Sequence, residues 1–310
     1  MSANPTPARA GTRLFTSVAF ALAAGSVITS LDPLRAQVSY TTAGSTYLQN
    51  FDSLPNTPQN ATLGNSPIGW TDDTATPGVN QFSIVGWYLY HPLLLAEGGA
   101  NGHQRLRIGA GTVNTGGFMS WGASGSTERA LGDVGSNTLA DPAGPGPADI
   151  YIGLRLHNDT GQTLDSFTLS YNGEQWRDGG AATPNAQSMN FAWSTTATDF
   201  TNGVFTSEAG LGYSSPVFAN TGSGAAVDGN VAGRVPLGPV TVTGLNWAPG
   251  TDLWLRWDDI NNAGNDHGLG IDDLNFSATA GVPEPSTFAL VGMGALILFA
   301  LRRKKSSKRF

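Results

Sequence analysis

Apolar and polar residues alternate in short runs along the middle of the chain, and no long run has apolar residues at helical spacing. Alternation over about four to eight residues is typical of a β-strand with one buried face. Clusters of Gly, Asn, Asp, Ser and Pro separate these runs and predict turns. Strands are predicted at Phe82–Tyr90, Leu106–Ile108, Ile152–Leu156, Phe167–Tyr171, Met189–Trp193, Val240–Val242, Leu253–Trp257 and Ile271–Phe276.

Many short strands without intervening helices predict an all-β fold. Because each strand has one apolar and one polar face, two antiparallel sheets packed face to face bury the apolar faces together. The sequence therefore predicts an antiparallel β-sandwich of the jelly-roll type over residues 37–280. The Pro- and Gly-rich run Asp141–Pro147 is predicted to be a loop inside this domain, since strand patterns continue on both sides of it.

Residues 1–36 have the order of a secretory signal peptide. Arg9 and Arg13 provide the positive start, the apolar run Leu14–Ile28 follows, and Ala36 is the predicted residue before the cleavage site. This segment predicts export of the rest of the chain.

Residues 281–310 have three parts in a fixed order. A short uncharged segment predicts a transmembrane helix over residues 287–301, and a basic tail follows over residues 302–310. The positive-inside rule places such a tail in the cytoplasm. At about 1.5 Å per residue the segment is shorter than the ~30 Å hydrocarbon core, which suits a temporary anchor. The first part, before the apolar segment, is the motif Val282, Pro283, Glu284 and Pro285.

In this order the three parts resemble the PEP-CTERM sorting signal. The resemblance implies that exosortase, a transpeptidase-like membrane protease, cuts the chain near the Pro-Glu-Pro motif. It also implies export and anchoring in the inner membrane through the helix before processing. The processed protein is then expected in the cell envelope or the extracellular matrix, often with exopolysaccharide in a biofilm. The resemblance implies no chemistry for residues 37–280.

Charge and composition exclude several classes of function. The exported residues 37–280 contain seven basic residues, all Arg, against 21 acidic residues, a formal net charge of −14. Such a domain repels phosphate backbones, so no nucleic-acid partner is expected. The chain has no Cys, which excludes disulfides, thiolate metal sites and Cys nucleophiles. We assign no catalytic residue from the sequence.

The densest polar run, Asp258–Leu274, contains five Asp, three Asn and one His. Ca²⁺ binds carboxylate, amide and backbone oxygens, so a loop of this composition is a candidate calcium site. The likeness of Phe51–Asp52 and Ile271–Leu274 to the ends of the jelly roll in MAM and lectin-like domains implies a shared calcium there. The expected ligands are Asp52, Asp272 and Asp273, with Asp258, Asp259 and Asp266 as further candidates.

Two observations limit this expectation. Strand alternation points Asp272 and Asp273 to opposite faces, so at most one is a ligand unless a bulge changes their direction. The alternative is that the Asp and Asn side chains cap turns and bond to loop amides.

His267, Glu128 and Glu174 are candidates for acid–base chemistry. His267 is a candidate general base or metal ligand, and a structural hydrogen bond in its loop is the favoured alternative. The two glutamates are candidates for the paired carboxylates of a glycosidase. Because Arg129 and Arg177 are close in sequence, internal ion pairs are the favoured role for these glutamates.

Two tryptophans are candidates for contact with sugar rings. Trp254 is predicted on the polar face of its strand, and Trp176 is in a Gly-rich segment. Trp193 and Trp257 are expected in the core. We therefore expect a non-enzymatic binding or matrix protein that associates with extracellular polysaccharide. The alternatives are a glycan-cleaving hydrolase on the same sandwich and a purely structural surface protein.

Overall fold

The computed structural model describes most of the domain that is predicted to be exported. The predicted signal peptide, the Asp141–Pro147 run and the motif Val282–Pro285 lie outside the described residues. Within the described part, no helix is long and apolar enough to cross a membrane. The described residues are 37–57, 59–60, 62–65, 84–90, 105–136, 150–198, 203–262, 264–281 and 297–298.

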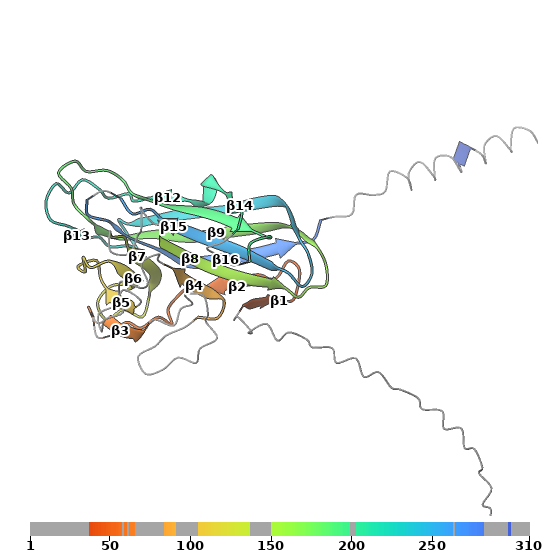
Figure 1. Cartoon of the computed structure of the whole chain (residues 1–310), viewed down its shortest axis with the longest axis horizontal. Coiled ribbons are helices and arrows are strands. Elements are labelled where there is room, and N and C mark those ends of the chain that lie inside the picture. The colour runs from red at the N-terminus through yellow and green to blue at the C-terminus, as the bar shows by residue number, and fades with distance from the viewer. Residues whose placement is uncertain are drawn as a thin grey trace, which may run out of the picture. The chain divides into compact units, whose positions relative to one another are not determined.

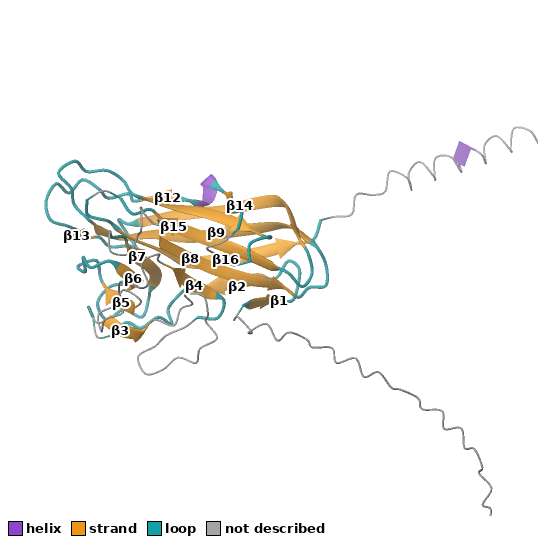
Figure 2. Ribbon diagram, in the orientation of Figure 1, coloured by secondary structure: helices purple, strands orange, loops and turns teal. Residues whose placement is uncertain are grey.

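Two β-sheets make up the described part of the domain, as Figures 1 and 2 show. Sheet A contains β1 (Val38–Tyr40), β4 (Trp87–Tyr90), β8 (Ile150–Asn158), β10 (Ser188–Ser194), β11 (Thr206–Ser207), β12 (Tyr213–Ser214) and β15 (Asp252–Asp259). Sheet B contains β2 (Thr46–Gln49), β3 (Thr62–Asn65), β5 (Arg105–Gly109), β6 (Gly117–Trp121), β7 (Ala130–Val134), β9 (Leu164–Asp178), β13 (Ala225–Ala226), β14 (Arg234–Trp247) and β16 (Gly268–Thr279).

Long strands that follow one another in sequence alternate between the sheets. β8, β10 and β15 lie side by side in sheet A, whereas β14, β9 and β16 lie side by side in sheet B. The pairs β8–β15, β10–β15, β9–β16 and β9–β14 are all antiparallel. β2, near the start of the domain, pairs with β16, at its end. Among the described strands only the pairs β1–β8 and β5–β6 are parallel. The alternation of long strands between two mainly antiparallel sheets confirms the predicted all-β jelly-roll sandwich.

The apolar faces of the two sheets meet in one core. The ring of Trp257 on β15 stacks on Trp87 of β4, with centroids 5.5 Å apart. Tyr171 of β9, in the other sheet, meets Trp257 edge-on at 5.7 Å. Burying such large aromatic side chains is a main favourable term in folding. The predicted core position of Trp257 is confirmed, and Trp193 is half-buried against this core.

Two strands that the sequence pattern missed are β6 and β7. Every residue of both strands is buried, so their sequences show no alternation of apolar and polar residues. A smaller apolar cluster on sheet B explains part of this burial: Met119, Trp121, Ala130, Val134 and Trp176. Sheet B is therefore covered on both faces in this region, and a period-two pattern is not expected there.

Candidate functional site

The face of sheet A that points away from the core carries aromatic and charged side chains. On β15 the core-facing residues alternate with three that lie on this outer face: Trp254, Arg256 and Asp258. Neighbouring strands add Tyr88 from β4 and Tyr151 from β8. The prediction that Trp254 lies on the face opposite the core is therefore confirmed.

The expectation that Trp254 is exposed is wrong. Its exposed fraction is 0%, and the ring of Tyr88 packs against it with centroids 5.1 Å apart. The guanidinium of Arg155 lies 5.6 Å from the centroid of the indole. A sugar ring therefore cannot stack on Trp254, whose role is to pack the strands of sheet A together.

Trp176 is also buried, with an exposed fraction of 2%. Its Nε1 donates a hydrogen bond to Glu174 Oε2 over 2.8 Å, and its ring packs in the small cluster on sheet B. The expectation of a second sugar platform at Trp176 is therefore wrong. Its Gly-rich neighbourhood allows close packing instead: a Cβ at Gly229 would lie 2.3 Å from the Trp176 ring.

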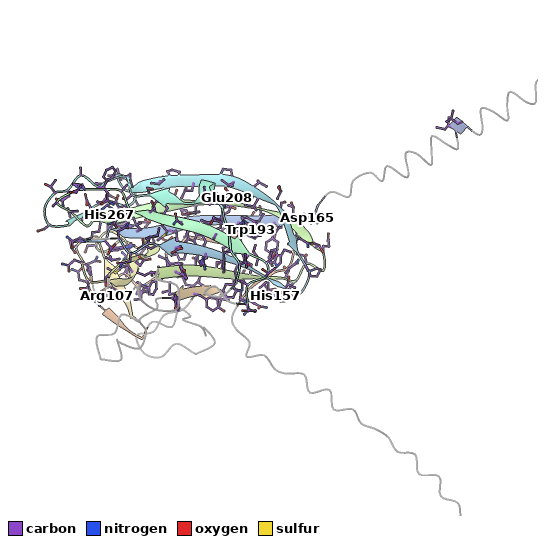
Figure 3. All side chains as sticks on the ribbon, turned by 45° about the horizontal axis from the view of Figure 1, so that its top comes forward. Arg107, His157, Asp165, Trp193, Glu208 and His267 are labelled. Carbon is purple, nitrogen blue, oxygen red and sulfur yellow. The ribbon has the colours of Figure 1, made fainter. Side chains whose placement is uncertain are left out.

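A polar pocket of about 530 Å³ opens beside the aromatic residues of sheet A. Its lining includes Arg256, whose Cζ lies 4.3 Å from the ring centroid of Tyr151 and 4.1 Å from that of Phe205. Glu208, labelled in Figure 3, lines the pocket and accepts a hydrogen bond from the backbone N–H of Gly210. Further polar lining comes from Ser188, Asn190, Ser207, Ser214 and Asp258.

The predicted calcium ligands do not come together as one set. Asp52 is exposed and accepts a hydrogen bond from Asn50. Asp258 lines the polar pocket on the outer face of sheet A, whereas Asp259 follows it on β15 and is buried. Asp266 accepts a hydrogen bond from the backbone N–H of Asn262 at the end of the loop before β16. Strand alternation separates Asp258 from Asp259, and a loop bond holds Asp266, so the Asp-rich run is not a single site.

Asp272 instead lies close to Glu128 and Glu174, which were not among the expected calcium ligands. One oxygen each from Glu128, Glu174 and Asp272 lies within 4.8 Å of the others, which makes them a candidate metal-binding group among the described residues. Glu128 precedes β7, Glu174 is on β9 and Asp272 is on β16. The glutamates stood out in the sequence as a pair, but their proximity to Asp272 depends on the register of β9 and β16, in which Glu174 pairs with Gly270.

Burial dominates the electrostatics of this carboxylate cluster. It raises the pKa of Glu174 to about 7, and the charge of Glu128 adds to the effect. Burial likewise raises the pKa of Asp272 to about 9, with a further contribution from the charge of Glu174. Asp273, exposed and at φ 50, lies at the edge of the cluster and accepts a hydrogen bond from Asn172 over 2.8 Å.

The prediction that the two glutamates form ion pairs with Arg129 and Arg177 is wrong. Glu174 accepts a hydrogen bond from Trp176, and Glu128 accepts one from the side-chain amide of Asn230. Arg129 donates to Ser120, and Arg177 donates to the carbonyl of Gly111. The strands turn each arginine toward oxygens of other segments, although it is close to its glutamate in sequence.

His267 forms part of a buried hydrogen-bond network at one end of the sandwich, away from His157 and Asp165 (Figure 3). Its Nδ1 lies 2.9 Å from Ser215 Oγ, and its Nε2 lies 3.4 Å from Asp178 Oδ1. Burial lowers the pKa of His267. Ser215 is itself only 2% exposed and accepts from the backbone N–H of Gln187, so it is not available to a substrate. The favoured structural role of His267 is therefore confirmed.

The described strands define the class of the exported domain, an all-β jelly-roll sandwich. Its sorting signal is the particular feature that places it among known proteins: residues 281–304 match the PEP-CTERM protein-sorting motif. The predicted PEP-CTERM resemblance is thus confirmed. Such a motif implies an exported protein that is anchored in a membrane and then processed. No curated protein matches the chain.

Several solved structures resemble the chain at low identity. The CBM22-1 xylan-binding domain of Xyn10C from Paenibacillus barcinonensis is 8% identical, with a TM-score of 0.32, covering 78% of this chain and 100% of that one. The K3 cleaved adhesin domain of Lys-gingipain from Porphyromonas gingivalis is 14% identical, with a TM-score of 0.31, covering 63% and 92%. A carbohydrate-binding module specific for non-crystalline cellulose, CBM28, is 11% identical, with a TM-score of 0.26, covering 63% and 89%. These values are too low to transfer a function.

Proposed function

We propose that the chain is an exosortase-processed protein of the cell envelope whose jelly-roll domain binds a neutral extracellular polysaccharide without cleaving it. The observation that carries this proposal is the polar pocket of about 530 Å³ on sheet A. Pockets that hold small ligands have volumes of roughly 300–1,000 Å³ and a few polar groups that fix orientation.

The lining of this pocket suits the hydroxyl groups of sugars. Glu208 and Asp258 accept hydrogen bonds, and Arg256 donates them in a planar arrangement. The serine and asparagine side chains that complete the lining both donate and accept. The rings of Tyr151 and Phe205 orient the Arg256 guanidinium, so less conformational freedom is lost on binding.

The charge of the domain favours a neutral polysaccharide over an acidic one. Residues 37–280 have a formal net charge of −14, which repels chains of uronate or sulfate groups. Because the C-terminal motif directs the protein to the envelope, the polysaccharide proposed as ligand is one that the cell exports. A role in a biofilm is part of this proposal.

The hydrolase alternative would use Glu128 and Glu174, whose carboxylates are close together. Retaining glycosidases place two carboxyl groups about 5–5.5 Å apart on either side of the scissile bond. However, Glu174 is 1% exposed and its neighbour Asp272 is 3% exposed. A glycosidic bond cannot reach between these groups, so we favour binding over cleavage.

A glycan array followed by calorimetry tests the proposal on the purified full chain. We expect binding to neutral glycans that Glu208→Gln weakens about tenfold, as the loss of one charged hydrogen bond predicts. Asn275→Gln is the matched control, because Asn275 is exposed on β16 in the other sheet. Equal weakening by both variants, or no glycan bound at all, would contradict the assignment of this pocket.

A further inference from the structure

A buried cluster of three carboxylates on sheet B has no role in the proposed glycan pocket. Glu128, Glu174 and Asp272 come from three separate segments, and one oxygen of each lies within 4.8 Å of the others. Three negative groups at this distance repel one another strongly where water is excluded. A folded protein retains such an arrangement when protons or a cation compensate for the charge.

Three oxygen atoms of this cluster have no hydrogen-bond donor among the described residues. They are Glu128 Oε1, Glu174 Oε1 and Asp272 Oδ1, and all three are inaccessible to solvent. Glu174 and Asp272 are more than nine-tenths buried as residues. Buried polar atoms are almost always paired, so three unpaired acceptors in one cluster point to a ligand that accepts electron pairs from all of them.

The remaining oxygens of the two glutamates are already held by neighbours. Trp176 Nε1 donates to Glu174 Oε2 over 2.8 Å, and Asn230 Nδ2 donates to Glu128 Oε2. These bonds fix each carboxylate and leave one oxygen free, much as outer hydrogen bonds orient the ligands of a metal. The pairing of β9 with β16 has a bulge between Asp272 and Asn275, directly after Asp272.

We infer that Glu128, Glu174 and Asp272 bind one calcium ion. All three ligands are carboxylates, which favour hard cations, and Ca²⁺ tolerates an irregular set of six to eight oxygens better than Mg²⁺ does. The ion ties together the segment before β7, β9 and β16, all in sheet B. Asp272 thus keeps its predicted role, while Glu128 and Glu174 replace Asp52 and Asp273 as its partners.

Terbium luminescence gives a direct test, because Tb³⁺ replaces Ca²⁺ and is excited by a nearby indole. Trp176 bonds to the ligand Glu174, so excitation of tryptophan in the EDTA-treated full chain should produce terbium emission that Ca²⁺ displaces. Trp176→Phe should reduce the emission, with Trp121 of the same cluster as a second indole, and leave calcium binding measurable by calorimetry. Absence of sensitised emission from the wild-type chain would overturn the assignment.

Substitutions distinguish this cluster from the set expected from the sequence. Glu174→Gln and Asp272→Asn should each weaken calcium binding at least tenfold, whereas the matched control Asp52→Asn should not change it. Glu174→Gln removes charge from a repelling group above neutral pH, so in EDTA at about pH 8 this variant should unfold at a temperature no lower than the wild type. In the wild type, calcium should raise the unfolding temperature more than magnesium does. An equal effect of magnesium, or equal loss in Asp52→Asn, would contradict the inference.

Discussion

The carboxyl groups of Asp133 on β7 and Asp259 on β15, from opposite sheets of the sandwich, influence each other's pKa. Asp133 is fully buried and Asp259 is 3% exposed. Neither oxygen of Asp133 has a hydrogen-bond partner among the described residues. Because burial disfavours the ionised form of both carboxyl groups, the pair holds a proton in the folded state.

This shared proton predicts that the domain is more stable at mildly acidic pH. Burial raises the pKa of Asp133 to about 6, and burial with the charge of Asp133 raises that of Asp259 well above 3.8. The folded state therefore keeps protons that the unfolded chain has lost, and stability falls as pH rises through about 6. Between about pH 4.5 and pH 8, we expect the Asp133 proton alone to contribute about 2 kcal/mol to this decrease in the free energy of unfolding.

Denaturant unfolding of Asp133→Asn against the wild type measures this contribution. Since the substituted amide carries no charge at any pH, the variant should lose less stability with rising pH and exceed the wild type at about pH 8. The lowered pKa of His267 acts in the opposite direction and is common to both proteins. Asp165→Asn, at an exposed site, is the control that should keep the wild-type pH profile. Parallel profiles for the wild type and Asp133→Asn would refute the shared proton.

Truncation of Trp254 should destabilise the domain, because its side chain is buried and not part of a ligand-binding surface. We expect Trp254→Ala to reduce the free energy of unfolding by about 3–5 kcal/mol, the range for buried aromatic truncations. Trp193→Ala, at a half-buried position, should cost distinctly less. Chemical denaturation of both variants decides the matter. A small loss for Trp254→Ala would mean that its ring is available to ligands after all.

Comparison of the structure with the sequence-based predictions shows which features were predictable from the sequence. Alternation along β15 assigned Trp254 to the correct face, because side-chain direction in a strand is a local property. Its burial depends on Tyr88, which reaches it from β4, far away in the sequence. No local pattern contains that contact. β6 and β7 were not predicted for a related reason: strands that are covered on both faces have no polar face that would make apolar and polar residues alternate.

The carboxylate cluster also depends on contacts between segments that are far apart in the sequence. Glu128, Glu174 and Asp272 each stood out in the sequence, but in two different hypotheses. Their meeting depends on the pairing of Gly270 with Glu174 and on a bulge next to Asp272. Register and bulges follow from the packing of whole sheets, so composition could suggest a cation site and could not select its ligands.

The sorting motif gives a prediction that is independent of the jelly roll. Replacing Pro283, Glu284 and Pro285 with alanine should block exosortase processing and leave export intact, because the predicted signal peptide is a separate segment. Protease accessibility follows export, and mass spectrometry follows removal of the C-terminal segment. Alanine replacement of Ser306 and Ser307, in the basic tail, is the control. Normal processing of the triple variant would show that the motif is not what exosortase recognises.

Arg256→Lys tests whether the guanidinium itself matters to the polar pocket. Lysine keeps the positive charge but loses the planar group that lies 4.3 Å from the centroid of Tyr151 and 4.1 Å from that of Phe205. We expect the free energy of unfolding to fall by about 1 kcal/mol and glycan affinity to fall about tenfold. Arg234→Lys, exposed on β14 of sheet B, should change neither quantity. Unchanged glycan affinity in Arg256→Lys would remove Arg256 from the ligand-binding residues, because charge alone would then suffice.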